Sequence, residues 1–151
     1  MHKQQLRKLV RETLKELGLH SEEAENLVLG TIAQESRAGF YIEQLGSGPA
    51  KGICQMEPAT YKDIWENFLA YKSSIADKVK ELRVSDTPNS DELRWNLKYS
   101  IAMCRVHYLR KKGAIPFSLQ GQAEYWKKHY NTYLGAGTVE EYINNYNKYI
   151  R

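Results

Sequence analysis

Apolar residues recur at spacings of three and four along nearly the whole chain, and this period restricts the fold more than any other feature. In the first segment Leu6, Val10 and Leu14 follow one another at four-residue steps, and Gly18 stands where a helix would end. This spacing places apolar side chains on one face of an α-helix, whereas a half-buried strand alternates every second residue. The chain is therefore predicted to be all-α.

Cap and stop residues divide the rest of the chain into further helices. Ser21 is placed to cap a second helix, and Pro58 suits the first position of a third. Thr138 and Glu141 form a capping box for the last helix. The predicted helices cover residues 6–17, 22–36, 58–68, 75–82, 91–112, 119–130 and 139–150. Residues 37–56 are rich in glycine and lack the period, so we expect an irregular loop with a short hairpin around 40–42.

Length and composition fit a single compact domain over residues 1–151. Hydrophobic residues make up 42% of the chain and charged residues 26%, which is ordinary globular composition. No apolar run approaches the roughly 18 residues of a membrane helix, so no transmembrane segment is expected. The net charge of +4 is modest, and no helix gathers arginine and lysine as a nucleic-acid-binding helix would. We expect a monomer that does not bind nucleic acid.

The first residues and the cysteines exclude two further classes. Residues 1–8 are polar and basic and are not followed by the apolar core of a secretory signal peptide. Cys54 and Cys104 are too few for a disulfide scaffold and lack the spacing of metal ligands. We expect two buried thiols, with a disulfide between them as the alternative.

The end of the second predicted helix is where chemistry is expected. Glu35 follows apolar turns that face the core, and the glycine-rich segment comes next. Burial of its carboxyl group would raise the pKa, and a carboxyl group protonated near neutral pH can act as a general acid. Gly52 would let the backbone approach a ligand closely, and Gln55 offers both hydrogen-bond donors and an acceptor.

Four short motifs occur in order along the chain. They are Glu35-Ser36, then Gly52-Ile53-Cys54-Gln55-Met56 with Pro58, then Trp95-Asn96-Leu97, and finally His129-Tyr130-Asn131. These motifs and their order resemble those of the goose-type lysozyme and soluble lytic transglycosylase superfamily. That family has a Glu-Ser pair at a helix end, a Gly-Leu-Met-Gln loop before a proline, a helix beginning with Asn-Leu or Asn-Ile, and an Ala-Tyr-Asn motif. The resemblance covers residues 27–133.

The chain departs from the family pattern at three places. Cys54 stands where methionine is usual, and His129 stands where alanine is usual. Thr132 and Tyr133 replace the small residues that commonly follow the last motif. These departures affect details of the substrate pocket more than the catalytic acid.

The resemblance implies a lysozyme-like helical domain that cleaves the β-1,4 bond between N-acetylmuramic acid and N-acetylglucosamine. Glu35 would protonate the bond oxygen and then act as base toward the C6 hydroxyl of muramic acid, which gives a 1,6-anhydro product. Tyr130 would donate a hydrogen bond to Glu35 and orient it. Substrate contacts are expected from Ser36, Gly52, Gln55, Met56 and Asn131. The partner is the glycan strand of peptidoglycan, with no metal or organic cofactor, and a phage endolysin or virion-associated wall-digesting protein fits these expectations.

Two alternatives remain open at this point. A hydrolytic muramidase would need a second carboxylate to activate water, for which Glu43, Glu57 and Asp63 are candidates. A non-catalytic glycan-binding protein of the same fold would use the same groove.

His107 and His129 have no partner at metal spacing and are expected to be structural or exposed. Most tyrosines from 125 to 149 are expected in the core, with a carbohydrate-stacking surface as the alternative.

Overall fold

The computed structural model describes residues 1–131 and 135–151, and in these residues it contains helices and no strand. The all-α, single-domain prediction is therefore confirmed. In chain order the α-helices are α1 (Lys3–Glu16), α2 (Glu22–Ser36), α3 (Pro58–Asn67), α4 (Ser73–Leu82), α5 (Glu92–Trp95), α6 (Leu97–Leu109), α7 (Leu119–Trp126) and α8 (Val139–Tyr149). Two 3₁₀ turns, η1 (Leu45–Ser47) and η2 (Leu69–Tyr71), and a π-helical turn, η3 (Lys127–Asn131), complete the elements.

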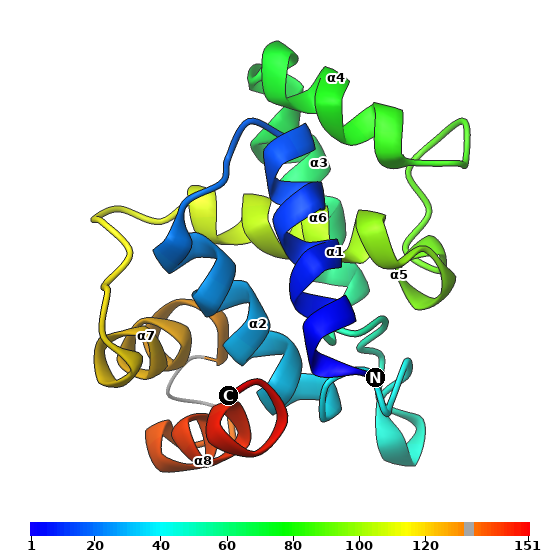
Figure 1. The fold of residues 1–151 in the computed structure, drawn as a ribbon. Coiled ribbons are helices and arrows are strands. Elements are labelled where there is room, and N and C mark those ends of the chain that lie inside the picture. The colour runs from blue at the N-terminus through cyan, green and yellow to red at the C-terminus, as the bar shows by residue number, and fades with distance from the viewer. Residues whose placement is uncertain (132–134) are drawn as a thin grey trace.

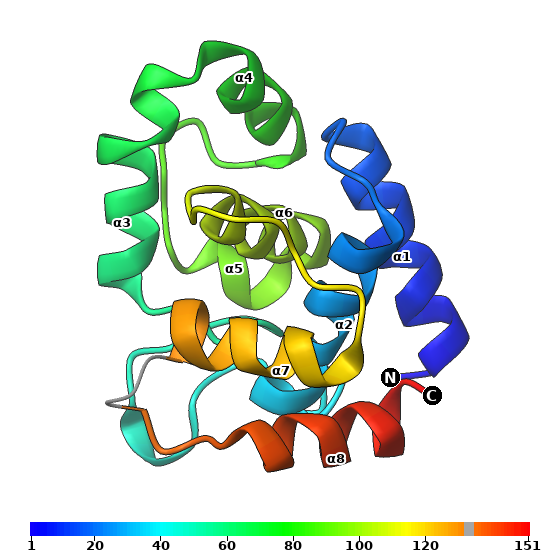
Figure 2. The same ribbon diagram turned by 90° about the vertical axis from the view of Figure 1, so that its left-hand side faces the viewer.

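Helices α2 and α6 form the centre of the domain, and the other helices surround them (Figures 1 and 2). α2 packs against α1, α7 and α8, while α6 packs against α1, α3 and α4. Both central helices are apolar around most of their circumference, and such helices are stable only when covered on several sides. The spacing of Ala24, Leu27, Val28 and Ile32 predicts one apolar face on α2. Leu29 and Ala33 lie outside that face and are also fully buried. No helix among the described residues is long and apolar enough to cross a bilayer.

Local sequence signals mark the starts of α2, α3 and α8 as predicted. The Ser21 hydroxyl accepts from the Ala24 N–H at 3.1 Å, and the Thr138 hydroxyl accepts from the Glu141 N–H at 3.1 Å. Pro58 is the first residue of α3. These ends depend on residues only three positions apart, which is why the sequence alone predicts them.

The predicted helix over 91–112 is wrong, because it is broken at Asn96. The backbone of Asn96 is extended (φ −103°, ψ 96°), and its side chain accepts from the Tyr99 N–H at 3.1 Å to cap α6. Its amide nitrogen donates to the Leu82 carbonyl at 2.9 Å and to the buried Glu92 carboxylate at 2.7 Å. The break is thus held by α4 as well as by α5. The boundary at Asn96-Leu97 matches the start of the helix that the family resemblance implies.

The glycine-rich segment is irregular, as predicted, but its pairing joins residues 42–44 to residues 50–56 and forms no hairpin at 40–42. Lys51 forms isolated antiparallel bridges with Glu43 and with Met56. The Gly52 N–H donates to the Ile42 carbonyl at 2.7 Å. The segment therefore folds back on itself twice and ends directly at α3.

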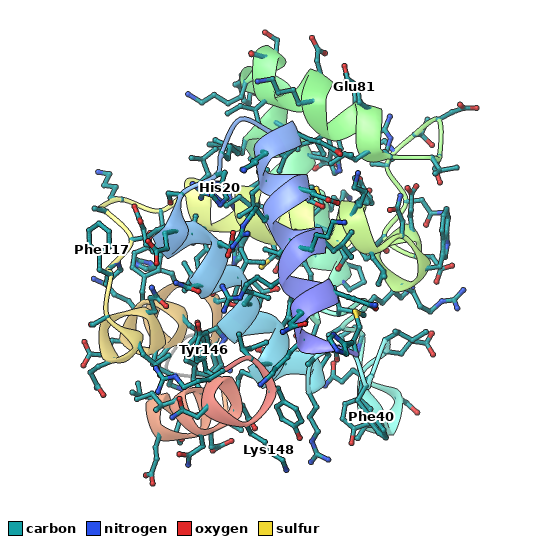
Figure 3. The ribbon with its side chains drawn as sticks, in the orientation of Figure 1. His20, Phe40, Glu81, Phe117, Tyr146 and Lys148 are labelled. Atoms are coloured by element: carbon teal, nitrogen blue, oxygen red, sulfur yellow. The ribbon has the colours of Figure 1, made fainter. Side chains whose placement is uncertain are left out.

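The aromatic residues near the C-terminus mostly pack inside, as predicted. Tyr125, Trp126, Tyr142 and Tyr146 are buried, and Tyr133 lies outside the described residues. The exposed rings lie elsewhere, and Phe40 and Phe117 project from the surface (Figure 3).

Candidate active site

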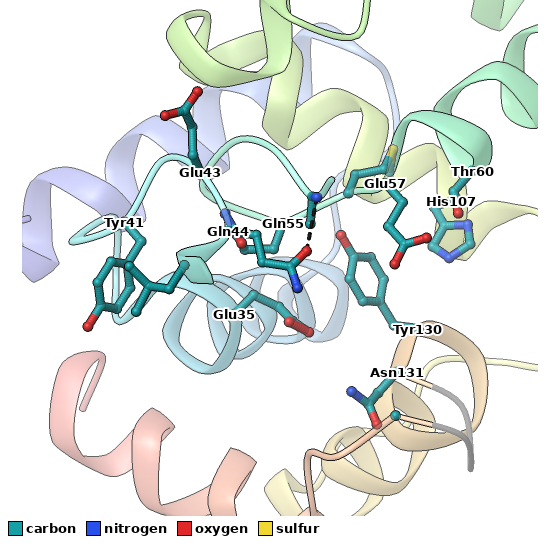
Figure 4. Close-up of a pocket in the computed structure, with 14 residues that line it drawn as sticks. Glu35, Tyr41, Glu43, Gln44, Gln55, Glu57, Thr60, His107, Tyr130 and Asn131 are labelled. Atoms are coloured by element: carbon teal, nitrogen blue, oxygen red, sulfur yellow. Dashed lines mark hydrogen bonds between the residues drawn. The ribbon is translucent and has the colours of Figure 1, made fainter. Parts of the chain in front are cut away.

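A cavity of about 620 Å³ lies where the end of α2, the segment 41–57, the start of α3 and the turn η3 meet (Figure 4). Five of the seven residues that are expected to act in catalysis or to contact substrate line it together, although they come from three separate parts of the chain. They are Glu35, Gln55, Met56, Tyr130 and Asn131.

Glu35 occupies the last turn of α2 and faces this cavity. Its side chain keeps partial exposure to the cavity, while protein atoms surround it on the other sides. Burial disfavours the charged form and raises the pKa of Glu35 to about 7, and the indole N–H of Trp126 acts in the opposite direction. The carboxyl group is thus protonated in a large fraction of molecules at neutral pH, as a general acid requires.

The Trp126 indole adds a donor beneath this carboxyl group. Trp126 is fully buried, and its Nε1 meets no acceptor at full hydrogen-bond geometry within residues 1–131 and 135–151. A buried N–H without a partner is rare. This N–H lowers the pKa of Glu35 and so favours the carboxylate form of its side chain.

The predicted hydrogen bond from Tyr130 to Glu35 is wrong. The Tyr130 hydroxyl donates instead to the backbone carbonyl of Cys54 at 2.5 Å. One phenol has one proton, so it cannot donate to Glu35 at the same time, although its oxygen can still accept. Tyr130 also stacks on Tyr108 with ring centroids 5.3 Å apart. The phenol therefore fixes the loop beside Glu35.

Two of the predicted ligand contacts are structural instead. Ser36 is fully buried, and its hydroxyl donates to the Ile32 carbonyl at 3.0 Å and accepts from the Gly39 N–H at 2.9 Å. Gly52 is buried with φ +81°, and a Cβ there would lie 2.3 Å from the Leu93 carbonyl oxygen. The prediction that these residues touch a ligand is wrong, because both are used to hold the ends of the irregular segment in place.

Gln55 and Met56 reach the cavity from the same turn. Gln55 has φ +49°, and its Nε2 donates to the Gly52 carbonyl at 2.9 Å. The Met56 N–H donates to the Lys51 carbonyl at 3.1 Å, which fixes the backbone next to it. The Gln55 side chain and the Met56 backbone are therefore held by bonds within residues 51–56.

Asn131 lines the cavity from the side opposite Gln55 and Met56. Its Oδ1 accepts from the Lys127 ammonium at 2.7 Å, and the same ammonium donates to the carbonyls of Gly135 at 2.9 Å and Gly137 at 2.7 Å. The helix predicted over 119–130 ends at Trp126, and the chain continues as the π-helical turn η3. π-Helical turns are frequent at functional sites.

The three candidate second carboxylates differ in position. Asp63 is bound to Arg110 at 2.7 Å and does not line the cavity. Glu43 lines it, but its carboxylate lies 3.5 Å from Arg94 and points away from Glu35 (Figure 4). Glu57 points to the side of the cavity that Tyr130 and His107 occupy (Figure 4). Of the three candidates, Glu57 lines the cavity and is not paired with an arginine among the described residues.

Cavity residues that were not predicted come from outside the motifs. Gln44 and His107 both line the cavity. Burial, together with the charges of Arg110 and Lys111, lowers the pKa of His107 to about 3, so this ring stays neutral. Its centroid lies 5.1 Å from that of Tyr130 in an edge-to-face arrangement. His107 is thus structural, as predicted, and no local sequence signal indicates its place in the cavity.

The two cysteines are free thiols and both are fully buried. This confirms the prediction of buried thiols and excludes the disulfide alternative in this structure. Burial raises the pKa of the Cys104 thiol well above its ordinary value, so it stays protonated. Within the described part of the chain, no three metal-binding side chains gather as a metal site would require.

A scan of protein-family models and searches of curated proteins and of solved structures found no match to this chain.

Proposed function

We propose that this protein cleaves peptidoglycan at the β-1,4 bond between N-acetylmuramic acid and N-acetylglucosamine, as a lytic transglycosylase. The observation that carries the proposal is the Glu35 carboxyl group, which faces a cavity of about 620 Å³ and has a pKa raised to about 7. The order of the four motifs and the presence of Gln55, Tyr130 and Asn131 around the same cavity support it.

One carboxyl group is sufficient for this reaction. Glu35 gives its proton to the bond oxygen, the bond from that oxygen to the muramic acid C1 breaks, and an oxocarbenium-like sugar forms. The C6 hydroxyl oxygen of the same sugar then attacks C1, and its proton passes to the Glu35 carboxylate. Glu35 thereby regains its proton, and no water is consumed. The Trp126 N–H would stabilise the carboxylate between these two steps.

Hydrolysis is the second candidate, and the position of Glu57 favours it. A second carboxylate in the same cavity could remove a proton from an attacking water molecule. Glu57 is exposed and lines the same cavity, so it is available as such a base. The two reactions differ in whether Glu57 is needed and in the mass of the product.

Digestion of purified sacculi tests both candidates. We expect wild-type protein to reduce turbidity and to release fragments lighter by one water molecule than hydrolytic products in mass spectrometry. Glu35→Gln should abolish release, and Glu57→Gln should retain it if no water is activated. Glu66→Gln is a matched control, because Glu66 is exposed on α3 outside the cavity.

Each outcome assigns the protein to one class. Equal lysis by wild type and Glu35→Gln would refute the catalytic role of Glu35. Loss of activity in Glu57→Gln with products of normal mass would identify a hydrolytic muramidase. Wild-type protein that binds sacculi without releasing fragments would identify a non-catalytic glycan-binding protein.

A further inference from the structure

His107 makes a hydrogen bond whose polarity is set by its partner. The Nδ1 atom of the ring lies 2.7 Å from Nη2 of Arg110, which stands at the end of the same helix, α6. A guanidinium group can only donate, so Nδ1 must accept in this contact. Turning the ring over would place a carbon atom opposite Arg110 and lose the bond. Arg110 therefore assigns both the orientation of the ring and the role of Nδ1.

Arg110 is in turn held by Asp63 on α3. Its Nη1 donates to one oxygen of the Asp63 carboxylate at 2.7 Å, and the other oxygen accepts from the Asn67 amide at 2.7 Å. The Arg110 side chain is only 16% exposed, so the guanidinium is enclosed between α3 and α6. Asp63, Arg110 and His107 thus form one chain of hydrogen bonds that ends at the cavity.

The His107 ring is neutral and carries its single proton on Nε2. Burial and the charges of Arg110 and Lys111 lower the pKa of His107 to about 3, so only one ring nitrogen holds a proton at neutral pH. Because Nδ1 accepts from Arg110, that proton is on Nε2. This tautomer follows from the contact with Arg110 and does not depend on what the cavity binds.

The Nε2–H group of His107 is free to bind a ligand. No group in residues 1–131 or 135–151 accepts from it. Although the whole residue is only 8% exposed, Nε2 is not among the fully buried polar atoms of this part of the chain, so it keeps access to the cavity that His107 lines. Glu57, Thr60 and Tyr130 lie at the same end of the cavity (Figure 4). The Tyr130 proton is used by the Cys54 carbonyl, so His107 supplies a fixed donor that Tyr130 does not.

We propose that His107 donates its Nε2–H to an oxygen of the ligand bound in the cavity, and that Arg110, held by Asp63, is the positioning residue that fixes this donor. A neutral imidazole without such a partner can present either a donor or an acceptor at the same nitrogen. The contact with Arg110 removes that choice. A hydroxyl, ether or carbonyl oxygen can therefore bind at Nε2, and a group that can only donate cannot. The identification of the ligand as a glycan rests on the proposed function, whereas the tautomer of His107 does not.

Nitrogen NMR of isotope-labelled protein tests the tautomer without any ligand or turnover. The protonated and unprotonated nitrogens of a neutral imidazole have well-separated chemical shifts, and His107→Gln identifies the signals of His107 by removing them. We expect the wild type to show one neutral tautomer at neutral pH, with the proton on Nε2. Arg110→Met should move both nitrogen shifts toward averaged values, because the ring can then exchange tautomers. Lys112→Met, which removes an exposed charge near the same helix end, should leave both shifts unchanged.

Two substitutions at His107 separate the ligand contact from the contact with Arg110. The amide nitrogen of glutamine can occupy the place of Nε2, whereas the shorter asparagine reaches only the place of Nδ1 and can still accept from Arg110. Both are made in the Glu35→Gln background, where the strand should stay uncut, and calorimetry measures the binding of soluble glycan strands prepared from sacculi. We expect His107→Gln to bind within about twofold of the parent and His107→Asn to bind about three- to tenfold more weakly. The Nε2 signal of His107 should also shift when strands are added to the parent.

Several results would overturn the proposal. A proton on Nδ1, or shifts that Arg110→Met leaves unchanged, would refute the positioning by Arg110. Equal binding by His107→Asn and the parent, or an equal loss in both His107 variants, would show that affinity does not depend on the N–H group. Strands that do not bind, or that bind without moving the Nε2 signal, would refute the ligand contact. Wild-type protein that binds strands without cutting them would instead refute the proposed function, and the His107 variants would still decide the contact.

Discussion

The raised pKa of Glu35 makes the stability of this protein depend on pH in a way that one substitution can isolate. Burial holds the pKa at about 7, against 4.5 for an ordinary glutamate. Between these two values the folded protein keeps a proton that the unfolded chain has released. The free energy of unfolding should therefore decrease as the pH rises through this interval, because the charged form is buried only in the folded state.

The size of this change in the free energy of unfolding follows from the difference between the two pKa values of Glu35. One pKa unit corresponds to about 1.4 kcal/mol, so the full penalty on the folded state above pH 7 is about 3 kcal/mol. Glutamine has nearly the same shape and never ionises, so Glu35→Gln removes this penalty. Below the ordinary pKa both side chains are neutral, and the variant and the wild type should differ only by a constant amount.

Urea unfolding of both proteins at several pH values measures this difference. We expect the variant to gain about 3 kcal/mol relative to the wild type between about pH 4 and pH 8, with most of the gain between pH 5 and pH 7. Every other titrating group is common to both proteins and cancels to first order. A difference that stays constant across this range would show that the Glu35 carboxyl has an ordinary pKa, and the argument for a general acid would fail.

Two further substitutions test how the irregular segment is held. Gly52→Ala should lower the free energy of unfolding by about 2 kcal/mol or more. The reason is that the new Cβ would meet the Leu93 carbonyl oxygen and that the residue has φ +81°. Stability equal to wild type in urea unfolding would contradict this packing. Tyr130→Phe should cost about 1–3 kcal/mol, because the Cys54 carbonyl loses its donor, and it should also slow the digestion of sacculi. Unchanged stability and unchanged digestion together would dismiss Tyr130 as a support of the site.

Much of the candidate site was predictable because it depends on the chain's local chemistry. Glu35 is recognisable as a carboxyl group at the end of an apolar helix, and Gln55 and Asn131 stand out through their motifs. Ser36 was misjudged because the same dipeptide that marks the site also ends the helix, and its hydroxyl is used there. Gln44 and Lys127 belong to none of the motifs, so the sequence does not single them out, although their partners Ala50 and Asn131 are close in the chain.

The amino-acid sequence by itself determined the helical class, the caps at Ser21 and Thr138, and the buried carboxyl group as a candidate acid. These features arise from interactions within one or two helical turns, and such interactions can be recognised without knowing the fold. Only the tertiary structure decided the break at Asn96 and the partner of the Tyr130 hydroxyl. Each is set by a hydrogen bond to a carbonyl in a distant segment, so it exists only once those segments have packed together.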